Sequence, residues 1–135
     1  MSAENPLYKP LVASTATAVS FTTTQLGGTE MIRKAFMMRL QPGGLAMYKK
    51  YHDEVWPELV AEIERQGIAK ITIFENDPIL FMYSEINDLE SWNRLWHSEI
   101  HEKWGEMMNP YMEFNSDGLV DAKVVREIFH LQTNA

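Results

Sequence analysis

The apolar side chains of this chain follow a regular spacing from residue 31 onward. Over residues 31–41 a mostly apolar set of side chains alternates with a more polar set, which is typical of a β-strand ending at Pro42-Gly43-Gly44. The apolar spacing then changes to three and four residues from Leu45 to about Gly67, which predicts a helix with one buried face. Because proline breaks the hydrogen-bond ladder of a helix, Pro57 predicts a kink or a restart near Val55.

The rest of the pattern completes an alternation of strands and helices. It contains strands at Ile68–Glu75 and Ile79–Ile86, a helix from Leu89 to Met108, and a last strand at Val124–Leu131. Asn76-Asp77-Pro78 has the composition of a hairpin turn, Asn87-Asp88 can cap the second helix, and Asn109-Pro110 closes it. The order β-α-β-β-α-β predicts an α+β fold of the ferredoxin-like, split βαβ type.

The predicted strands are apolar on both faces, although two helices can cover only one face of a sheet. Phe36 and Met38 alternate with Ala35 and Met37, so neither side of the first strand is polar throughout. An exposed apolar face of this size would promote aggregation unless something covers it. We therefore expect a homodimer joined sheet to sheet, a dimeric α+β barrel with a pocket between sheet and helix edges.

Residues 1–30 differ from residues 31–135, which we expect to form one α+β domain. The first thirty residues are rich in threonine and serine and are expected to be a poorly ordered extension. Hydroxyl side chains interrupt Leu11–Phe21, the best candidate for a secretion signal, and no segment is apolar enough to span a membrane. The alternative for Thr15–Thr24 is a strand added to the sheet of its own chain or a partner.

The charge and composition of the chain argue against several classes of function. The 12 Lys and Arg residues stand against 19 Asp and Glu, giving a net charge of −7 that argues against nucleic acid or an anionic membrane as partner. The absence of cysteine excludes disulfides, thiol nucleophiles and thiolate-bound metals, and favours a cytoplasmic location. No glycine-rich phosphate loop and no nucleophile elbow is present, so no nucleotide cofactor is expected.

Two polar side chains interrupt the apolar stripe of the first helix. Tyr48 and His52 are four residues apart on one helical face, and Trp56 lies one turn further on. An imidazole titrates near neutral pH and a phenol can relay a proton, so the pair suits acid–base catalysis, while the alternative is a core histidine bonded to a backbone carbonyl. Aromatic faces pack against sugars, although the four tryptophans also suit a core.

The other histidines give weaker signals. His97 and His101 are also four residues apart, but Ser98 occupies the place where a zincin helix carries glutamate. Their neighbours place both imidazoles on a solvated helix face, and we expect no metal site. The position of His130 in the last predicted strand allows either a pocket or an exposed edge.

Several segments resemble the L-rhamnose mutarotase family. They are Met31–Phe36, the run Tyr48-x-x-x-His52-x-x-x-Trp56-Pro57-Glu58-Leu59, Leu80-Phe81 before Glu85-Ile86, and Glu127-x-Phe129. The similarity covers residues 31 to about 131. It implies a dimeric α+β barrel that interconverts the anomers of a 6-deoxy-L-sugar, most simply L-rhamnose, without metal or nucleotide. It also implies that His52 is the proton donor, and that Tyr48 and Trp104 contact the sugar.

The chain departs from the family pattern at two positions of the expected site. Ile71 stands where the family pattern has a sugar-contacting tyrosine, and a Trp-Trp pair is reduced to Trp104-Gly105. Together with Trp56, these residues form the expected sugar site, which should be more apolar at Ile71 and roomier beside Trp104. A site that lacks a hydrogen-bonding partner discriminates less between sugars, so we expect a weaker preference for L-rhamnose.

Exchange of anomers needs one group to remove the O1 proton and another to protonate the ring oxygen. His52 can serve as one, and Tyr48, a bound water, Glu85 or His130 are candidates for the other. Two other functions fit the same residues. One is a cofactor-poor monooxygenase or haem enzyme with His52 as iron ligand, and the other is a sensor domain that binds a small sugar without turning it over.

Overall fold

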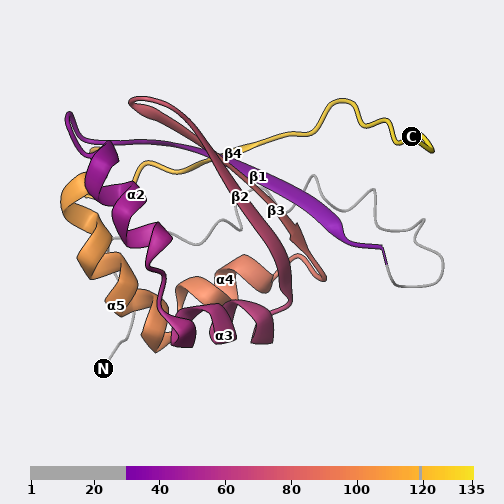
Figure 1. The fold of residues 1–135 in the computed structure, drawn as a ribbon, viewed down its shortest axis with the longest axis horizontal. Helices are drawn as coiled ribbons and strands as arrows, with labels where there is room; N and C mark the ends of the chain where they lie inside the picture. Colours follow the sequence, from indigo (N-terminus) through magenta and orange to yellow (C-terminus); the bar gives the residue numbers. More distant parts are fainter. Residues whose placement is uncertain (1–29, 119) are drawn as a thin grey trace.

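The computed structural model describes residues 30–118 and 120–135 (Figure 1). Its elements, in chain order, are β1 (Ile32–Arg39), α2 (Leu45–Asp53), α3 (Pro57–Arg65), β2 (Ile68–Asn76), β3 (Ile79–Ile86), α4 (Ser91–Trp96), α5 (Glu99–Met108), the 3-10 helix η3 (Asn109–Tyr111) and β4 (Lys123–Val125). The expected N-terminal extension and the possible arm at Thr15–Thr24 lie outside the described residues, apart from Glu30.

The four strands form one antiparallel sheet in the order β2-β3-β1-β4. This is the strand order of a ferredoxin-like fold, so the predicted fold class is confirmed. The helices gather on one side of the sheet (Figure 1). Phe36 lies opposite Met82 and Met38 opposite Leu80 in the β1–β3 register, and these four side chains are buried on that helix-covered face. We call it the inner face.

The first helical segment is interrupted where proline predicted it. The helix α2 ends at Asp53 and α3 begins at Pro57, with Trp56 in an extended conformation as its N-cap. Proline at the first position of a helix loses no hydrogen bond, because the amide there has no partner within the helix. The restart therefore costs little, and it allows α2 and α3 to point in different directions.

The second helical segment is also interrupted, and here the expectation of one helix from Leu89 to Met108 is wrong. It divides into α4 and α5. Ser98 caps α5, and its hydroxyl accepts a hydrogen bond from the His101 amide at 3.3 Å. Asp88 does not cap α4 but accepts the Glu90 amide one residue before the helix begins. The break at Ser98 shifts which side chains of α5 face inward.

The last strand is shorter than the predicted Val124–Leu131, because β4 pairs with β1 only over Lys123–Val125. Beyond it, Glu127 accepts two hydrogen bonds from the Arg33 guanidinium, at 3.0 and 2.9 Å. The strand β1 begins at Ile32, so within the described residues the chain past Ile128 finds no neighbouring strand. Ile128, Phe129 and Leu131 are exposed, by 83%, 77% and 68%.

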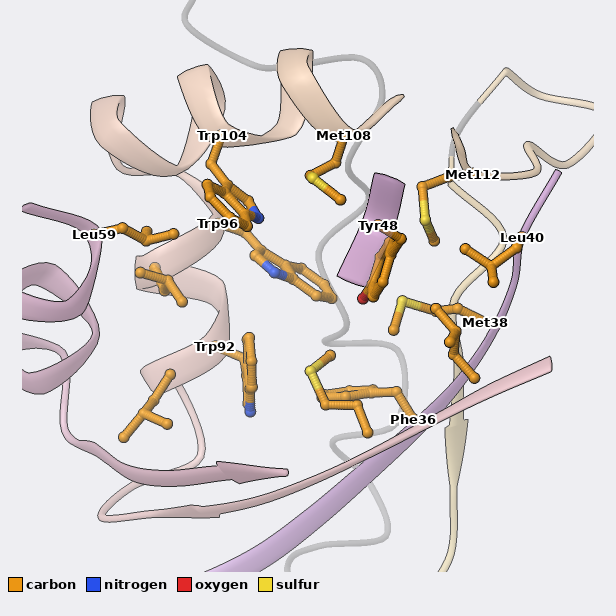
Figure 2. Packing of buried hydrophobic residues seen from close by; sticks show 14 of the residues in the cluster. Phe36, Met38, Leu40, Tyr48, Leu59, Trp92, Trp96, Trp104, Met108 and Met112 are labelled. Atoms are coloured by element: carbon orange, nitrogen blue, oxygen red, sulfur yellow. The ribbon is translucent and has the colours of Figure 1, made fainter. Parts of the chain in front are cut away.

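The core lies between the inner face and the helices, and tryptophans of α4 and α5 fill much of it (Figure 2). The Trp92 ring meets Phe36 edge-on, with ring centres 5.3 Å apart. Its indole N–H donates to the Ser84 hydroxyl at 2.9 Å, and that hydroxyl donates to the Lys34 carbonyl at 2.7 Å. This buried chain of hydrogen bonds ties α4 to β3 and β1 and leaves the indole satisfied.

Candidate functional site

A cavity of about 360 Å³ opens between the inner face and the helices. Most of its wall consists of leucine, isoleucine, methionine and tryptophan side chains. Tyr48, Trp96, Trp104 and Met108 lie around this space (Figure 2). An apolar pocket with a few polar groups is the usual form of a small-molecule site, and its volume suits a single small ligand.

The predicted catalytic face of α2 points into this cavity. The rings of Tyr48 and His52 are stacked with centres 4.2 Å apart, and both residues line the cavity. Trp104 meets the His52 ring edge-on at 5.1 Å. Trp56 is not among the lining residues, but its ring packs against Trp104 at 5.2 Å. The structure therefore brings these four aromatic rings together, with Trp56 behind Trp104.

One hydrogen bond fixes the protonation pattern of His52. Its Nδ1 lies 2.8 Å from the backbone carbonyl of Tyr48. A carbonyl can only accept, so Nδ1 carries the proton and Nε2 is the nitrogen that can accept one. Burial lowers the pKa of His52 below 6.5, opposed by the Tyr48 carbonyl and by the charge of Asp53. The backbone bond expected of a structural histidine is thus present, on a ring that also lines the cavity.

Of the two departures from the family pattern, Ile71 lines the cavity and Gly105 does not. Ile71, on β2, lines it together with Ile73 and Met82 from the same face of the sheet. Gly105 follows Trp104 on α5 and is buried. The apolar side chain of Ile71 therefore forms part of the sheet floor, where a tyrosine would add a hydroxyl.

His101 is a lining residue that the sequence analysis assigned to a solvated helix face, and that assignment is wrong. Its side chain is only 8% exposed, and it lines the same cavity as His52. The break before α5 changes the helix phase, so His101, Trp104 and Met108 share the inward face. Burial lowers the pKa of His101 to about 3, so the imidazole is neutral at neutral pH. The signal in the sequence was Ser98, a favoured N-cap residue directly after His97.

The cavity also has a polar border. The border consists of Asn115 and Asp121, which precede β4, and of Lys123, the first residue of β4. The Lys123 ammonium pairs with the Asp121 carboxylate at 2.8 Å. The Asp121 amide is bonded to the Glu113 carbonyl, which helps to fix this segment. Their place at the cavity depends on the β1–β4 pairing and on the backbone bridges Leu40–Met112 and Phe114–Val120.

Comparison with known proteins identifies the family. A model of L-rhamnose mutarotase matches residues 33–131. The chain belongs to the L-rhamnose mutarotase family. A protein of that name from Oceanobacillus iheyensis is 38% identical over 103 residues, spanning 75% of this chain and 99% of that protein. The protein of the same name from Bacillus subtilis is 35% identical over 103 residues, with the same coverage of both chains.

Solved structures agree with membership of the L-rhamnose mutarotase family. The crystal structure of L-rhamnose mutarotase from Formosa agariphila matches with a TM-score of 0.64 and 29% identity, over 75% of this chain and 99% of that one. A conserved protein from Methanosarcina mazei shares the fold with a TM-score of 0.53 at 14% identity, over 75% and 96% of the two chains. Mutarotases are carbohydrate isomerases, and this member of the L-rhamnose mutarotase family is therefore an isomerase.

The other polar residues that the sequence offered as candidates for the site lie away from the cavity. His97 is exposed, as expected, and its Nδ1 bonds to the Asn93 carbonyl at 2.7 Å. Glu85 bonds the Tyr83 hydroxyl at 2.8 Å on the sheet face opposite the helices, and His130 is exposed. Neither lines the cavity, which removes both as candidates for the second proton carrier. No helix among residues 30–118 and 120–135 has both the length and the apolar character to span a bilayer.

The burial of His101 predicts a pH-dependent stability. The pKa is about 3 in the fold and about 6.5 when exposed, so the unfolded chain binds this proton more tightly. The free energy of unfolding should fall as pH drops from about 6.5 toward 3, by on the order of 2 kcal/mol by about pH 4.5. His101→Gln should remove that part of the loss, as measured by urea unfolding at about pH 7 and about pH 4.5.

His97→Gln is the matched control, because its side chain is exposed, and it should keep the pH dependence of the unchanged protein. Equal pH dependence in the unchanged protein and in His101→Gln would show that His101 is not held neutral by burial.

Proposed function

We propose that this protein interconverts the α and β anomers of a 6-deoxy-L-sugar, most simply L-rhamnose, by acid–base ring opening. The observation that carries the proposal is His52, a histidine whose proton-accepting Nε2 is set by the Tyr48 carbonyl and whose ring lines a cavity with Tyr48 and Trp104. Membership of the L-rhamnose mutarotase family, whose relatives from several bacteria carry that name, supports the choice of sugar.

The walls of the cavity suit a deoxy sugar. Indole and phenol rings pack against the C–H faces of a pyranose, and Trp104 and Tyr48 both contact the His52 ring. The 6-methyl group of such a sugar is apolar and can rest against isoleucine or methionine side chains. A polar 6-hydroxyl would lose hydrogen bonds to water there unless a protein group replaced them.

The proposed reaction moves two protons and changes no oxidation state. Nε2 of His52 takes the proton from O1, a second carrier donates a proton to the ring oxygen, and the C1–O5 bond breaks to give an open-chain aldehyde. Rotation about C1–C2 presents the other face of the aldehyde. Ring closure then returns both protons and gives the other anomer, and in this step His52 is the proton donor that the family resemblance implies, because it returns the proton to O1.

Tyr48 is the proposed second proton carrier. Its ring is stacked on His52, and its phenol can donate a proton to the ring oxygen while the imidazole takes one from O1. The charges that then develop on the two rings are opposite and adjacent, so each stabilises the other within apolar walls.

Two other functions considered for this fold are less well supported. A haem enzyme would use His52 as an iron ligand, and a sensor domain would bind sugar without turnover. Family membership favours the mutarotase over both. Purified protein that absorbs near 400 nm would favour the haem enzyme, and sugar binding without faster anomer exchange would favour the sensor.

We also propose a homodimer joined through the outer face of the sheet, the face opposite the helices. Phe74 and Phe81 lie opposite each other in the β2–β3 register on that face, and they are 61% and 42% exposed. Met37 is the β1 partner of Phe81, and Val125 is also exposed there. A second copy could cover this surface and pair with the exposed segment after β4, because a two-fold axis places the same surfaces opposite each other.

The proposed partners are thus a monosaccharide and a second copy of the chain. We propose that the protein binds neither nucleic acid nor a membrane. The net charge of −7 supports this, because phosphate-rich surfaces repel an acidic protein. A chain without cysteine is suited to a reducing compartment, so we propose the cytoplasm as its location.

The role of His52 predicts a large loss of activity in His52→Gln. Exchange between the anomers of L-rhamnose should slow by a factor of roughly 10²–10⁴, the usual contribution of acid–base catalysis. Because burial lowers the pKa of His52, activity in the unchanged protein should fall on the acid side only below pH 6.5. Saturation-transfer NMR measures the exchange, with His97→Gln as the control for an exposed histidine. A folded His52→Gln protein with the unchanged rate would remove His52 from the mechanism.

The proposed dimer predicts the mass in solution. Light scattering at micromolar concentration should give twice the mass of one chain, and Phe81→Glu should give a monomer because it places charge in the apolar interface. Val60→Glu is the control, since Val60 is 46% exposed on α3, away from the sheet face. A monomer before any substitution would refute the interface.

Ile71 predicts broad sugar selectivity. A tyrosine hydroxyl at this position would favour one sugar over others. Without it, the unchanged protein should exchange the anomers of L-fucose and other pyranoses at rates close to its rate for L-rhamnose. Ile71→Tyr should sharpen the preference for L-rhamnose, measured by NMR exchange with L-rhamnose, L-fucose and D-glucose. Ile71→Phe is the matched control, because it adds the ring without the hydroxyl. If the unchanged protein accepts L-rhamnose alone, Ile71 does not set the selectivity.

A further inference from the structure

The cavity contains a second histidine that the proposed proton transfers do not use. His101 lies in the first turn of α5, and its backbone amide donates to the capping hydroxyl of Ser98. Trp104 follows three residues later and Met108 seven, so the three side chains form one inward stripe of the helix. All three line the cavity that His52 and Tyr48 line from α2.

His101 differs from His52 in its chemical state. Desolvation lowers its pKa to about 3, so the imidazole is neutral at neutral pH. A neutral imidazole is a poor proton donor, but one nitrogen carries a hydrogen and the other accepts one. That combination matches a sugar hydroxyl, which also both donates and accepts.

The surroundings of His101 favour a binding role over a proton-transfer role. Its ring lies 6.4 Å from the Trp96 ring, and most of the wall around it is apolar. Among the described residues, the charged or titratable side chains that line the cavity with it are Tyr48, His52, Asp121 and Lys123. An apolar residue could fill this wall at a lower cost of desolvation than an imidazole.

We infer that His101 binds a hydroxyl group of the pyranose and thereby helps to determine which sugars the cavity accepts. The inference rests on the proposed mutarotase function. The two histidines then have different tasks, because their surroundings separate their pKa values. His52 moves protons, and His101 holds the sugar in the orientation in which O1 reaches His52.

The experiment compares His101→Phe, which keeps a ring without nitrogens, with His101→Gln, which keeps a donor and an acceptor. NMR exchange rates over a range of sugar concentrations give KM and kcat for L-rhamnose and for its 2-deoxy, 3-deoxy and 4-deoxy analogues. His101→Phe should raise KM for L-rhamnose about tenfold, the factor of one neutral hydrogen bond, with kcat changed less than about threefold. His101→Gln should recover most of the affinity.

The analogues separate binding from a structural role. One deoxy sugar, the one that lacks the hydroxyl bound by His101, should show the same KM with His101→Phe as with the unchanged protein. A KM that rises equally for every sugar, or for none, overturns the inference. His97→Gln is the control and should match the unchanged protein with all four sugars, since His97 is exposed.

A second measurement does not use His101→Phe, so it tests the inference even if that variant does not fold. Ring nitrogen resonances of the four histidines are recorded with and without L-rhamnose, and His101→Gln assigns the His101 signals. Saturating sugar should shift them, and unchanged His101 signals overturn the inference. If the unchanged protein accelerates exchange of none of these sugars, the proposed function fails. Accelerated exchange without an effect of His101 leaves that function standing and removes His101 alone.

Discussion

Two interruptions in the helices determine where the site lies. A continuous helix from Leu45 to Arg65, or from Ser91 to Met108, would present one fixed stripe to the sheet. The break at Pro57 lets α3 pack Leu59 into the core while α2 turns Tyr48 and His52 to the cavity. The break at Ser98 does the same on the other side, because α5 restarts with a new phase. The cavity forms where α2 and α5 face each other above the inner face.

The sheet links this site to the opposite side of the molecule. Successive residues of a strand point to opposite faces, so each strand that builds the cavity floor also builds the outer face. In β3, Met82 lines the cavity while its neighbours Phe81 and Tyr83 point outward. A second copy on the outer face would therefore hold the strands that carry Ile71 and Met82, although it would touch no ligand. Formation of the dimer and binding of the sugar would therefore depend on the same register of the strands.

The sequence predicted those features whose signals are local. Pro57 predicted the first helix break, and the i, i+4 spacing placed Tyr48 and His52 on one face. The second break has a weaker signal, because serine is common within helices as well as at N-caps, and missing it placed His101 in solvent. The length of β4 depends on where β1 begins, which is a tertiary property that local pattern does not contain.

The same physical effect, removal from water, gives the two cavity histidines different properties. Desolvation lowers both pKa values, but His52 also donates to the Tyr48 carbonyl and lies near the charge of Asp53, and both raise its pKa. For His101, desolvation by burial lowers the pKa further, to about 3. A group that must gain and lose a proton at neutral pH needs such compensation, whereas a group that only forms hydrogen bonds does not. In this cavity the backbone carbonyl one turn before His52 would therefore support the proposed catalysis in two ways, since it fixes the tautomer and limits the fall in pKa.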